Sequence, residues 1–431
     1  MSVKNITLQA EEPPTITVSS KTQQASPSDW SADDFITEWN TVFGQKVFDM
    51  PHMATRALHT TIGLILKDVN VHFKGSYTDL RDSSIVMQDS GTGKKPTIEF
   101  LEEVVECLGL EFRRRSTITS AGAVGTIVIE DVIDPETGCK QRQGIVVFGD
   151  LKNLDLITCS EADSILYSKI DSFGNDLLTN ICDSQDPKNL ISKKLANGEV
   201  KPFTSHTSFF LTTTIPSAVN PRWFEKGLFQ RFGISIKRVN FDKYQEIRDS
   251  LITAVGEEVD LSSEIKQLAE ALKSKNVPEK FEFAPEIRSG FLEKARLLDK
   301  TLTDLKNSAI LNSLKSFTVR RDLKMITYAC HHAWLDERSK LTIKDIDYAY
   351  EVSSESWRDV LNFVCRNAST TQSCPNAILS VMSDGKLRSI DEIREKLKGF
   401  SDENIRYSLS VLVKSRMLNH PQRTHYVKLD C

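Results

Sequence analysis

The stretch that decides the fold is SIVMQDSGTGKK, residues 84–95, in which a short apolar run leads into a glycine-rich turn and two lysines. Beyond it, Ile98, Leu101 and Val105 recur at helical spacing, so a strand, a tight loop and a helix follow one another. Loop N–H groups at the positive end of a helix bind phosphate oxygens, and a lysine adds a countercharge. The sequence therefore predicts a nucleotide-phosphate site formed by Ser90, Gly91, Thr92, Gly93, Lys94 and Lys95.

Two positions depart from the full phosphate-loop motif. Gln88 stands five residues before Gly93, where the motif has its first glycine. Lys95 stands where a serine or threonine holds Mg²⁺. Taken alone, the motif fits a Gly-Lys turn that binds no ligand as well as it fits a phosphate site. The surrounding sequence has to distinguish these two interpretations.

The segments that follow alternate between strand-like and helical patterns, which favours an α/β layer domain. LDLITC, residues 154–159, is a buried-strand pattern that brings Ser160, Glu161 and Asp163 to its C-terminal end. Open α/β sheets bind ligands at that edge. A glutamate there can orient or deprotonate an attacking water, although an ordinary solvated strand end is the alternative.

Two inserted hairpins and one arginine complete the pattern. An extended hairpin turns at residues 134–138, and a second one, residues 191–204, carries Lys193, Lys194 and Lys201. These lysines suit non-specific contacts to DNA phosphates, although a hairpin kept soluble by its charges is the alternative. Arg231, in GLFQRFG, is placed to act on the nucleotide of a neighbouring subunit.

Composition and patterning divide the 431 residues into several regions. A hydrophobic content of 39% and a charged content of 26% indicate a globular chain, and the net charge of −4 confines polyanion binding to local basic surfaces. We expect a disordered tail (1–28), an N-terminal helical segment (29–80), an α/β core (81–240), a helical lid (241–366) and a winged helix (374–431).

Other sequence features bear on location and metals. No apolar run reaches the roughly 18–20 residues that span a bilayer, so we expect no membrane partner and a cytoplasmic protein, or a nuclear one in a eukaryote. The eight cysteines are scattered without ligand spacing, so no structural metal site is expected.

The order of these parts resembles the AAA+ motor of the minichromosome maintenance (MCM) replicative helicases, over roughly residues 80–430. By this resemblance Lys94 is the Walker A lysine, Glu161 the Walker B glutamate and Arg231 the arginine finger. Residues 120–138 resemble the family's helix-2 insert, and residues 191–204 its pre-sensor-1 hairpin. FTVRRDLKMITYACHHAW resembles the lid helix that carries the sensor-2 arginine. Spacing to Leu323 favours Arg321 and spacing to Ala333 favours Arg320, and we take Arg321 as the preferred candidate.

The resemblance implies a P-loop AAA+ ATPase core with a parallel sheet between helices, a helical lid and a C-terminal winged helix. It implies ATP and Mg²⁺ as ligands, DNA as a partner, assembly into a homo-hexameric ring and contacts with replication proteins. Three positions differ from the family pattern: Lys95 replaces the Mg²⁺-binding hydroxyl, Ser160 the Walker B aspartate and Ile215 the sensor-1 asparagine, leaving Thr214 as the nearby sensor candidate.

These departures leave two functions open. The first is an ATP-driven DNA helicase or translocase, and the second is a hydrolysis-poor AAA+ subunit or replication initiator that binds nucleotide and DNA. The three changes affect the metal or the lytic water and favour the second, while Lys94, Glu161 and Arg231 favour the first.

Overall fold

The computed structural model describes residues 30–133, 140–172, 174–195, 198–216, 223, 226–256, 259–303, 314, 317–368, 378–379, 381–382, 386–397, 402–414, 418–422 and 425–428. The expected tail, residues 1–28, lies outside these ranges. Within them, no helix is both long enough and apolar enough to cross a bilayer.

A five-stranded parallel sheet forms the centre of the α/β core. Its strands lie in the order β11 (Phe232–Lys237), β3 (Ser83–Gln88), β10 (Ser208–Thr213), β7 (Leu156–Cys159) and β4 (Phe112–Arg115). Strands β3, β7 and β10 are buried along their whole length, as expected where helices cover both faces of a parallel sheet. The predicted α/β class with a parallel sheet between helices is confirmed.

The strand order places one crevice at the end of β3. The later strands β4, β7 and β10 all lie on one side of β3, whereas β11 lies on the other. Such a reversal leaves a gap at the carboxyl ends of the strands, where open α/β sheets bind ligands. The turn that follows Gln88 sits at this gap, between the ends of β10 and β11.

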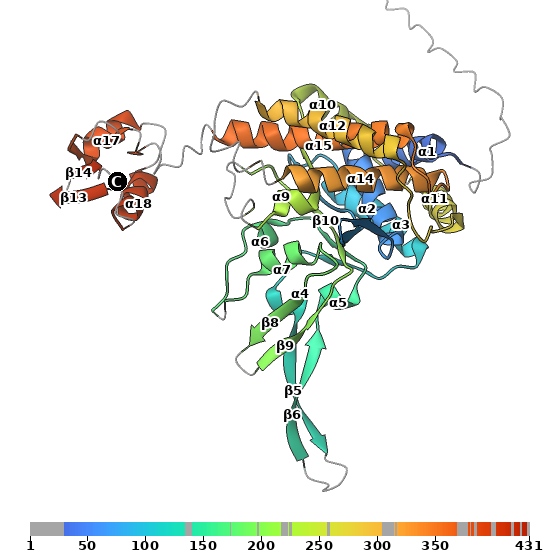
Figure 1. Ribbon diagram of the computed structural model, residues 1–431, viewed down its shortest axis with the longest axis horizontal. Coiled ribbons are helices and arrows are strands. Elements are labelled where there is room, and N and C mark those ends of the chain that lie inside the picture. The colour runs from blue at the N-terminus through green and yellow to red at the C-terminus, as the bar shows by residue number, and fades with distance from the viewer. Residues whose placement is uncertain are drawn as a thin grey trace, which may run out of the picture.

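Helices from both ends of the chain share one apolar core with the sheet. The predicted capped helix near Ser31 is α1, where Ser31 and Asp34 form a capping box. Trp39 of α1 packs edge-on against Phe100 of α3, with ring centroids 5.1 Å apart. Figure 1 shows α12, α14 and α15 as a layer above the sheet. The larger helices are α1 (Ala32–Lys46), α2 (Pro51–Ile65), α3 (Lys94–Leu108), α10 (Phe241–Thr253), α11 (Ser262–Ser274), α12 (Pro285–Thr303), α14 (Thr318–Leu335) and α15 (Ile343–Ala368).

Both predicted hairpins are present and extend away from the helical layer (Figure 1). They are β5 (Gly125–Ile133) with β6 (Lys140–Phe148), and β8 (Ile191–Leu195) with β9 (Gly198–Phe203). A short hairpin that the sequence did not signal, β1 (Asn70–Phe73) with β2 (Ser76–Asp79), precedes β3. Short helices connect these elements: α4 (Ser120–Val124), α5 (Asp150–Asn153), α6 (Asp163–Leu166), α7 (Leu177–Asp183) and α9 (Leu228–Arg231).

The C-terminal part has an apolar core of its own, which includes Ile378, Ile393 and Leu409. It contains α17 (Ile390–Lys396), α18 (Asp402–Lys414) and a small antiparallel sheet in the order β12 (Arg388–Ser389), β14 (His425–Lys428) and β13 (Leu418–Gln422). Its identity as a winged helix stays a prediction.

A buried hydrogen-bond relay joins α2, α14 and α15. His331 Nε2 lies 2.8 Å from the Leu80 carbonyl oxygen, so this nitrogen must donate, and neutral His331 accepts at Nδ1. His59 Nδ1, 3.0 Å away, therefore donates to His331, and His59 Nε2 accepts from the Tyr348 hydroxyl at 3.1 Å. Each imidazole has to be neutral for this order of donors to hold. Burial lowers the pKa of His331 to about 4.

The relay predicts that acid weakens the fold. Because the pKa of His331 is depressed in the folded state, its contribution to stability is present above about pH 6.5 and is lost as the pH falls toward 4. Between pH 7.5 and pH 5 this amounts to about 2 kcal/mol of unfolding free energy. Urea unfolding across this range should show a flatter pH dependence for His331→Asn than for the wild type. If the unfolding free energy of the variant and of the wild type changes equally with pH, the relay is contradicted.

Candidate nucleotide-binding site

A cavity of about 670 Å³ opens at the carboxyl edge of the sheet, beside the turn between β3 and α3. The predicted phosphate-loop residues 90–95 line it together with residues that follow β7 and β10. Its size falls in the range of nucleotide and small-ligand pockets. The cavity brings together these predicted side chains, with Thr213 beside them: Ser90, Gly91, Thr92, Gly93, Lys94, Lys95, Ser160, Glu161, Asp163 and Thr214.

Two glycines shape the turn. Gly91 has φ +75°, and Gly93, the N-cap of α3, has φ +93°, both in the left-handed region that favours glycine. A side chain at Gly93 would also meet Val47 Cγ1 at 2.9 Å and Phe48 Cδ2 at 3.2 Å, whereas the space beside Gly91 is open. Gly93 is therefore required for both its backbone conformation and its packing.

Lys94 is held at the mouth of the loop. Its ammonium donates to the Gln88 carbonyl oxygen at 2.6 Å and to the Asp89 carbonyl oxygen at 2.9 Å. Burial lowers the pKa of Lys94, and the nearby carboxylates of Asp89, Asp163 and Glu161 oppose that shift. The charge thus stands between the loop and the acidic side of the cavity, where phosphate oxygens would meet it.

The acidic side of the cavity comes from the segment after β7. Glu161 is exposed to the cavity, and Asp163 accepts a hydrogen bond of 3.2 Å from the Thr213 hydroxyl. Lys95 points toward solvent, with its ammonium 3.8 Å from Glu99 Oε1 on the next turn of α3. Position 95 therefore supplies no hydroxyl for Mg²⁺, but Glu161 and Asp163 are the oxygen ligands that this ion accepts beside phosphates.

Arg231 lies at the opposite edge of the sheet from the phosphate loop. It immediately precedes β11, whose first residue pairs with Ser83 and whose last residue pairs with Gln88. Six strand residues span about 20 Å, so Arg231 cannot reach the loop of its own chain. The Arg231 guanidinium donates to the Lys226 carbonyl oxygen at 2.8 Å and lies 3.7 Å from Asp183 Oδ1.

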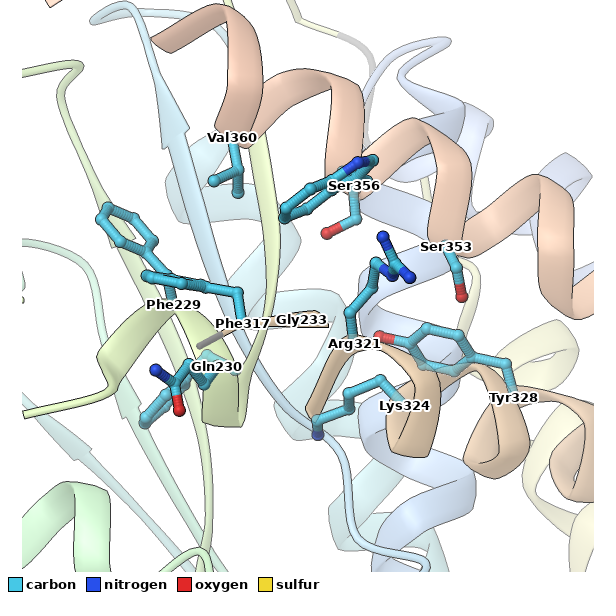
Figure 2. Close-up of a pocket in the computed structure, with 12 residues that line it drawn as sticks. Phe229, Gln230, Gly233, Phe317, Arg321, Lys324, Tyr328, Ser353, Ser356 and Val360 are labelled. Atoms are coloured by element: carbon cyan, nitrogen blue, oxygen red, sulfur yellow. The ribbon is translucent and has the colours of Figure 1, made fainter. Parts of the chain in front are cut away.

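The two candidate lid arginines have different surroundings. Arg321, which we preferred for sensor 2, is 6% exposed, pairs with Asp299 at 2.9 Å and lies over the Trp357 ring. Figure 2 shows its guanidinium beside Ser353 and Ser356 of α15. Arg320 instead reaches the surface, 3.2 Å from Asp186, and lines one small pocket with Arg231. Arg320 is therefore the lid arginine that shares a face with Arg231, and Arg321 belongs to the packing of the lid.

The hairpin lysines do not all face solvent. Lys194 and Lys201 are exposed, whereas Lys193 is only 5% exposed, and burial lowers its pKa. Side chains alternate along a strand, so Lys193 shares the inward face of β8 with buried Ile191. The structure thus leaves two of the three predicted lysines available for DNA phosphates.

Two apolar side chains in the cavity were not predicted. Phe48 precedes α2, and Leu251 is 55% exposed near the end of α10. Together they form an apolar wall next to the phosphate loop. No local pattern marks either residue, because Phe48, between α1 and α2, and Leu251 of α10 reach the cavity only through tertiary packing.

Comparison with known protein families finds none that matches this chain, and a search of curated proteins finds no similar sequence.

The two glycines give a matched test of the turn. Gly93→Ala should cost about 3 kcal/mol of unfolding free energy, because it adds a clash to the left-handed strain. Gly91→Ala meets open space and should cost about 1 kcal/mol. Urea unfolding of both variants measures the difference, and equal losses would contradict the packing described at Gly93.

Proposed function

We propose that this chain is an MCM-like AAA+ ATPase that moves along DNA as a hexameric ring in replication. The observation that carries the proposal is the separation of two complementary half-sites. The candidate phosphate-binding cavity stands at one edge of the sheet, and two partly exposed arginines, Arg231 and Arg320, line one small pocket toward the other. A head-to-tail assembly joins these two edges between neighbouring chains.

Each side of the joint site has a chemical role. The loop N–H groups and Lys94 hold the phosphates, and Glu161 orients the attacking water. Glu161 and Asp163 would hold Mg²⁺, which neutralises phosphate charge when bound. Arg231 and Arg320 of the next chain supply positive charge as the terminal phosphate is transferred.

An exposed apolar surface on and just after α10 supports self-association. Phe241, Ile252 and Val255 are 71%, 64% and 79% exposed. Leu251, next to Ile252, lines the phosphate cavity, so this surface reaches the half-site that contains the phosphate loop. The described residues that line this cavity include no arginine. Exposed apolar side chains can mark interaction surfaces, and in the proposed ring a second copy covers the C-terminal end of α10 and brings its arginines to the cavity.

The proposed DNA contacts come from the inserted hairpins and the C-terminal part. Lys194 and Lys201 are exposed on the β8–β9 hairpin, which packs beside the longer β5–β6 hairpin. Two hairpins that extend from the core suit a channel lining (Figure 1). The C-terminal helices and sheet, as a winged helix, would add a second DNA or protein contact.

The cavity also gives weight to the second candidate, a subunit that binds nucleotide but hydrolyses it poorly. Lys95 points to solvent, Ser160 offers a hydroxyl in place of a carboxylate, and Ile215 packs partly against the apolar core. None of the three residues supplies the functional group that the MCM family has at the same position: a hydroxyl at 95, a carboxylate at 160 or an amide at 215. Glu161 and Asp163 decide whether the site retains hydrolysis.

The turnover of ATP separates the two candidates. The wild type, with Mg²⁺ and single-stranded DNA, should hydrolyse ATP faster than Lys94→Ala, since that variant loses the phosphate countercharge. Lys194→Ala/Lys201→Ala should lose the stimulation by DNA and keep the basal rate. A wild-type rate equal to that of Lys94→Ala, with retained nucleotide binding, would favour the hydrolysis-poor subunit.

Mixing two inactive variants tests the joint site. Lys94→Ala damages only the loop and Arg231→Ala only the arginine edge, so a 1:1 mixed ring contains intact sites at about one quarter of its interfaces. Activity should therefore reappear on mixing. Activity of Arg231→Ala alone at the wild-type rate would contradict a role across the interface, because an arginine finger contributes roughly 10³-fold or more.

A further inference from the structure

The glutamine that replaces the first glycine of the motif makes two specific contacts inside the turn. Gln88 is fully buried at the end of β3. Its Nε2 lies 3.0 Å from the Thr92 carbonyl oxygen, and its Oε1 lies 2.6 Å from His52 Nε2 on α2. The contact to a carbonyl oxygen requires an N–H donor, which fixes the orientation of the amide and makes His52 the donor to Oε1.

The bond to Thr92 determines which way the loop N–H groups face. In a planar trans peptide the C=O and the following N–H point in opposite directions. The Thr92 carbonyl is turned inward to Gln88, so the N–H of Gly93 is turned outward, on the side of the cavity. An outward N–H at this position is what a phosphate oxygen requires.

Further contacts fix this arrangement from both sides. The Thr92 hydroxyl donates to the Asp89 carbonyl oxygen at 2.6 Å, and Gln88 Nε2 also lies 3.8 Å from Met50 Sδ just before α2. His52 is held on α2 next to the sheet, where burial lowers its pKa. The loop is therefore tied through Gln88 to α2, which precedes the sheet in the chain.

We propose that His52 and Gln88 form a brace that holds the phosphate loop in its binding conformation, as positioning residues for the nucleotide. The proposal rests on the proposed nucleotide site and adds to it a reason for the missing glycine. In this chain the contact between His52 and the buried Gln88 side chain fixes the turn, whereas the full motif has a glycine at position 88. Both residues act through Thr92 and need not touch the ligand.

Nucleotide binding by the full-length chain tests the brace, with a fluorescent ATP analogue as the probe. His52→Ala and Gln88→Ala should each weaken binding about tenfold, the 1.4 kcal/mol expected for one lost buried hydrogen bond. His52→Ala/Gln88→Ala should be no weaker than the worse single variant, because the two residues form one chain of contacts. His52→Gln, whose amide N–H replaces the imidazole N–H as donor to Gln88 Oε1, should restore most of the affinity.

Two further variants sharpen the test. Gln88→Gly restores the first glycine of the motif, yet the brace predicts weaker binding, since the Thr92 carbonyl and His52 lose their partner. Thr55→Ala, one turn along α2, removes a hydroxyl that bonds only within the helix and should leave binding unchanged. Wild-type affinity in Gln88→Gly and His52→Ala would overturn the brace.

Amide hydrogen exchange in the nucleotide-free chain decides the question independently of binding. His52→Ala and Gln88→Ala should raise exchange at residues 90–93 and leave exchange in β10 and β11 unchanged. Unchanged exchange at residues 90–93 would overturn the brace, whether or not nucleotide binds. If the wild type binds no nucleotide but the two variants show the raised exchange at residues 90–93, the proposed function is refuted and the brace stands.

Discussion

The peptide bond between Thr92 and Gly93 carries the constraint on which the site depends. Its carbonyl is bonded inward to Gln88, so its N–H is directed outward, while the positive φ of Gly93 starts α3 directly behind it. Strand order leaves a gap at the same point, because β10 and β11 lie on opposite sides of β3. The orientation of one peptide and the order of the strands thus place the phosphate loop beside a cavity at the sheet edge.

The same sheet explains why the proposed function needs more than one chain. Parallel strands bring their carboxyl ends to one edge, so residues before β11 and residues after β3 stand about 20 Å apart. Arg231 and Arg320 therefore face away from their own cavity, next to a surface where a neighbour would dock. Leu251 of α10 lines the cavity, and the neighbouring exposed apolar side chains Ile252 and Val255 suit the other side of that contact.

Local patterns predicted the parts of the fold whose signals are local. The strand, loop and helix around residues 84–108, both hairpins and the capped helix at Ser31 follow from periodicity and turn chemistry. Arg320 and Arg321 illustrate the limit, since neighbouring residues on a helix point about 100° apart and only packing shows which is buried. Lys193 is buried by strand alternation, and His52 meets Gln88 only through tertiary packing.

We propose that the turn at residues 90–94 binds the phosphates of a nucleotide shared between two chains. The most direct measurement is an experimental structure of the chain with a non-hydrolysable ATP analogue and Mg²⁺. The account predicts phosphate oxygens at the N–H groups of residues 91–94, with Arg231 of an adjacent copy facing the terminal phosphate. An analogue bound elsewhere, or a cavity that stays empty at saturating analogue, would contradict it.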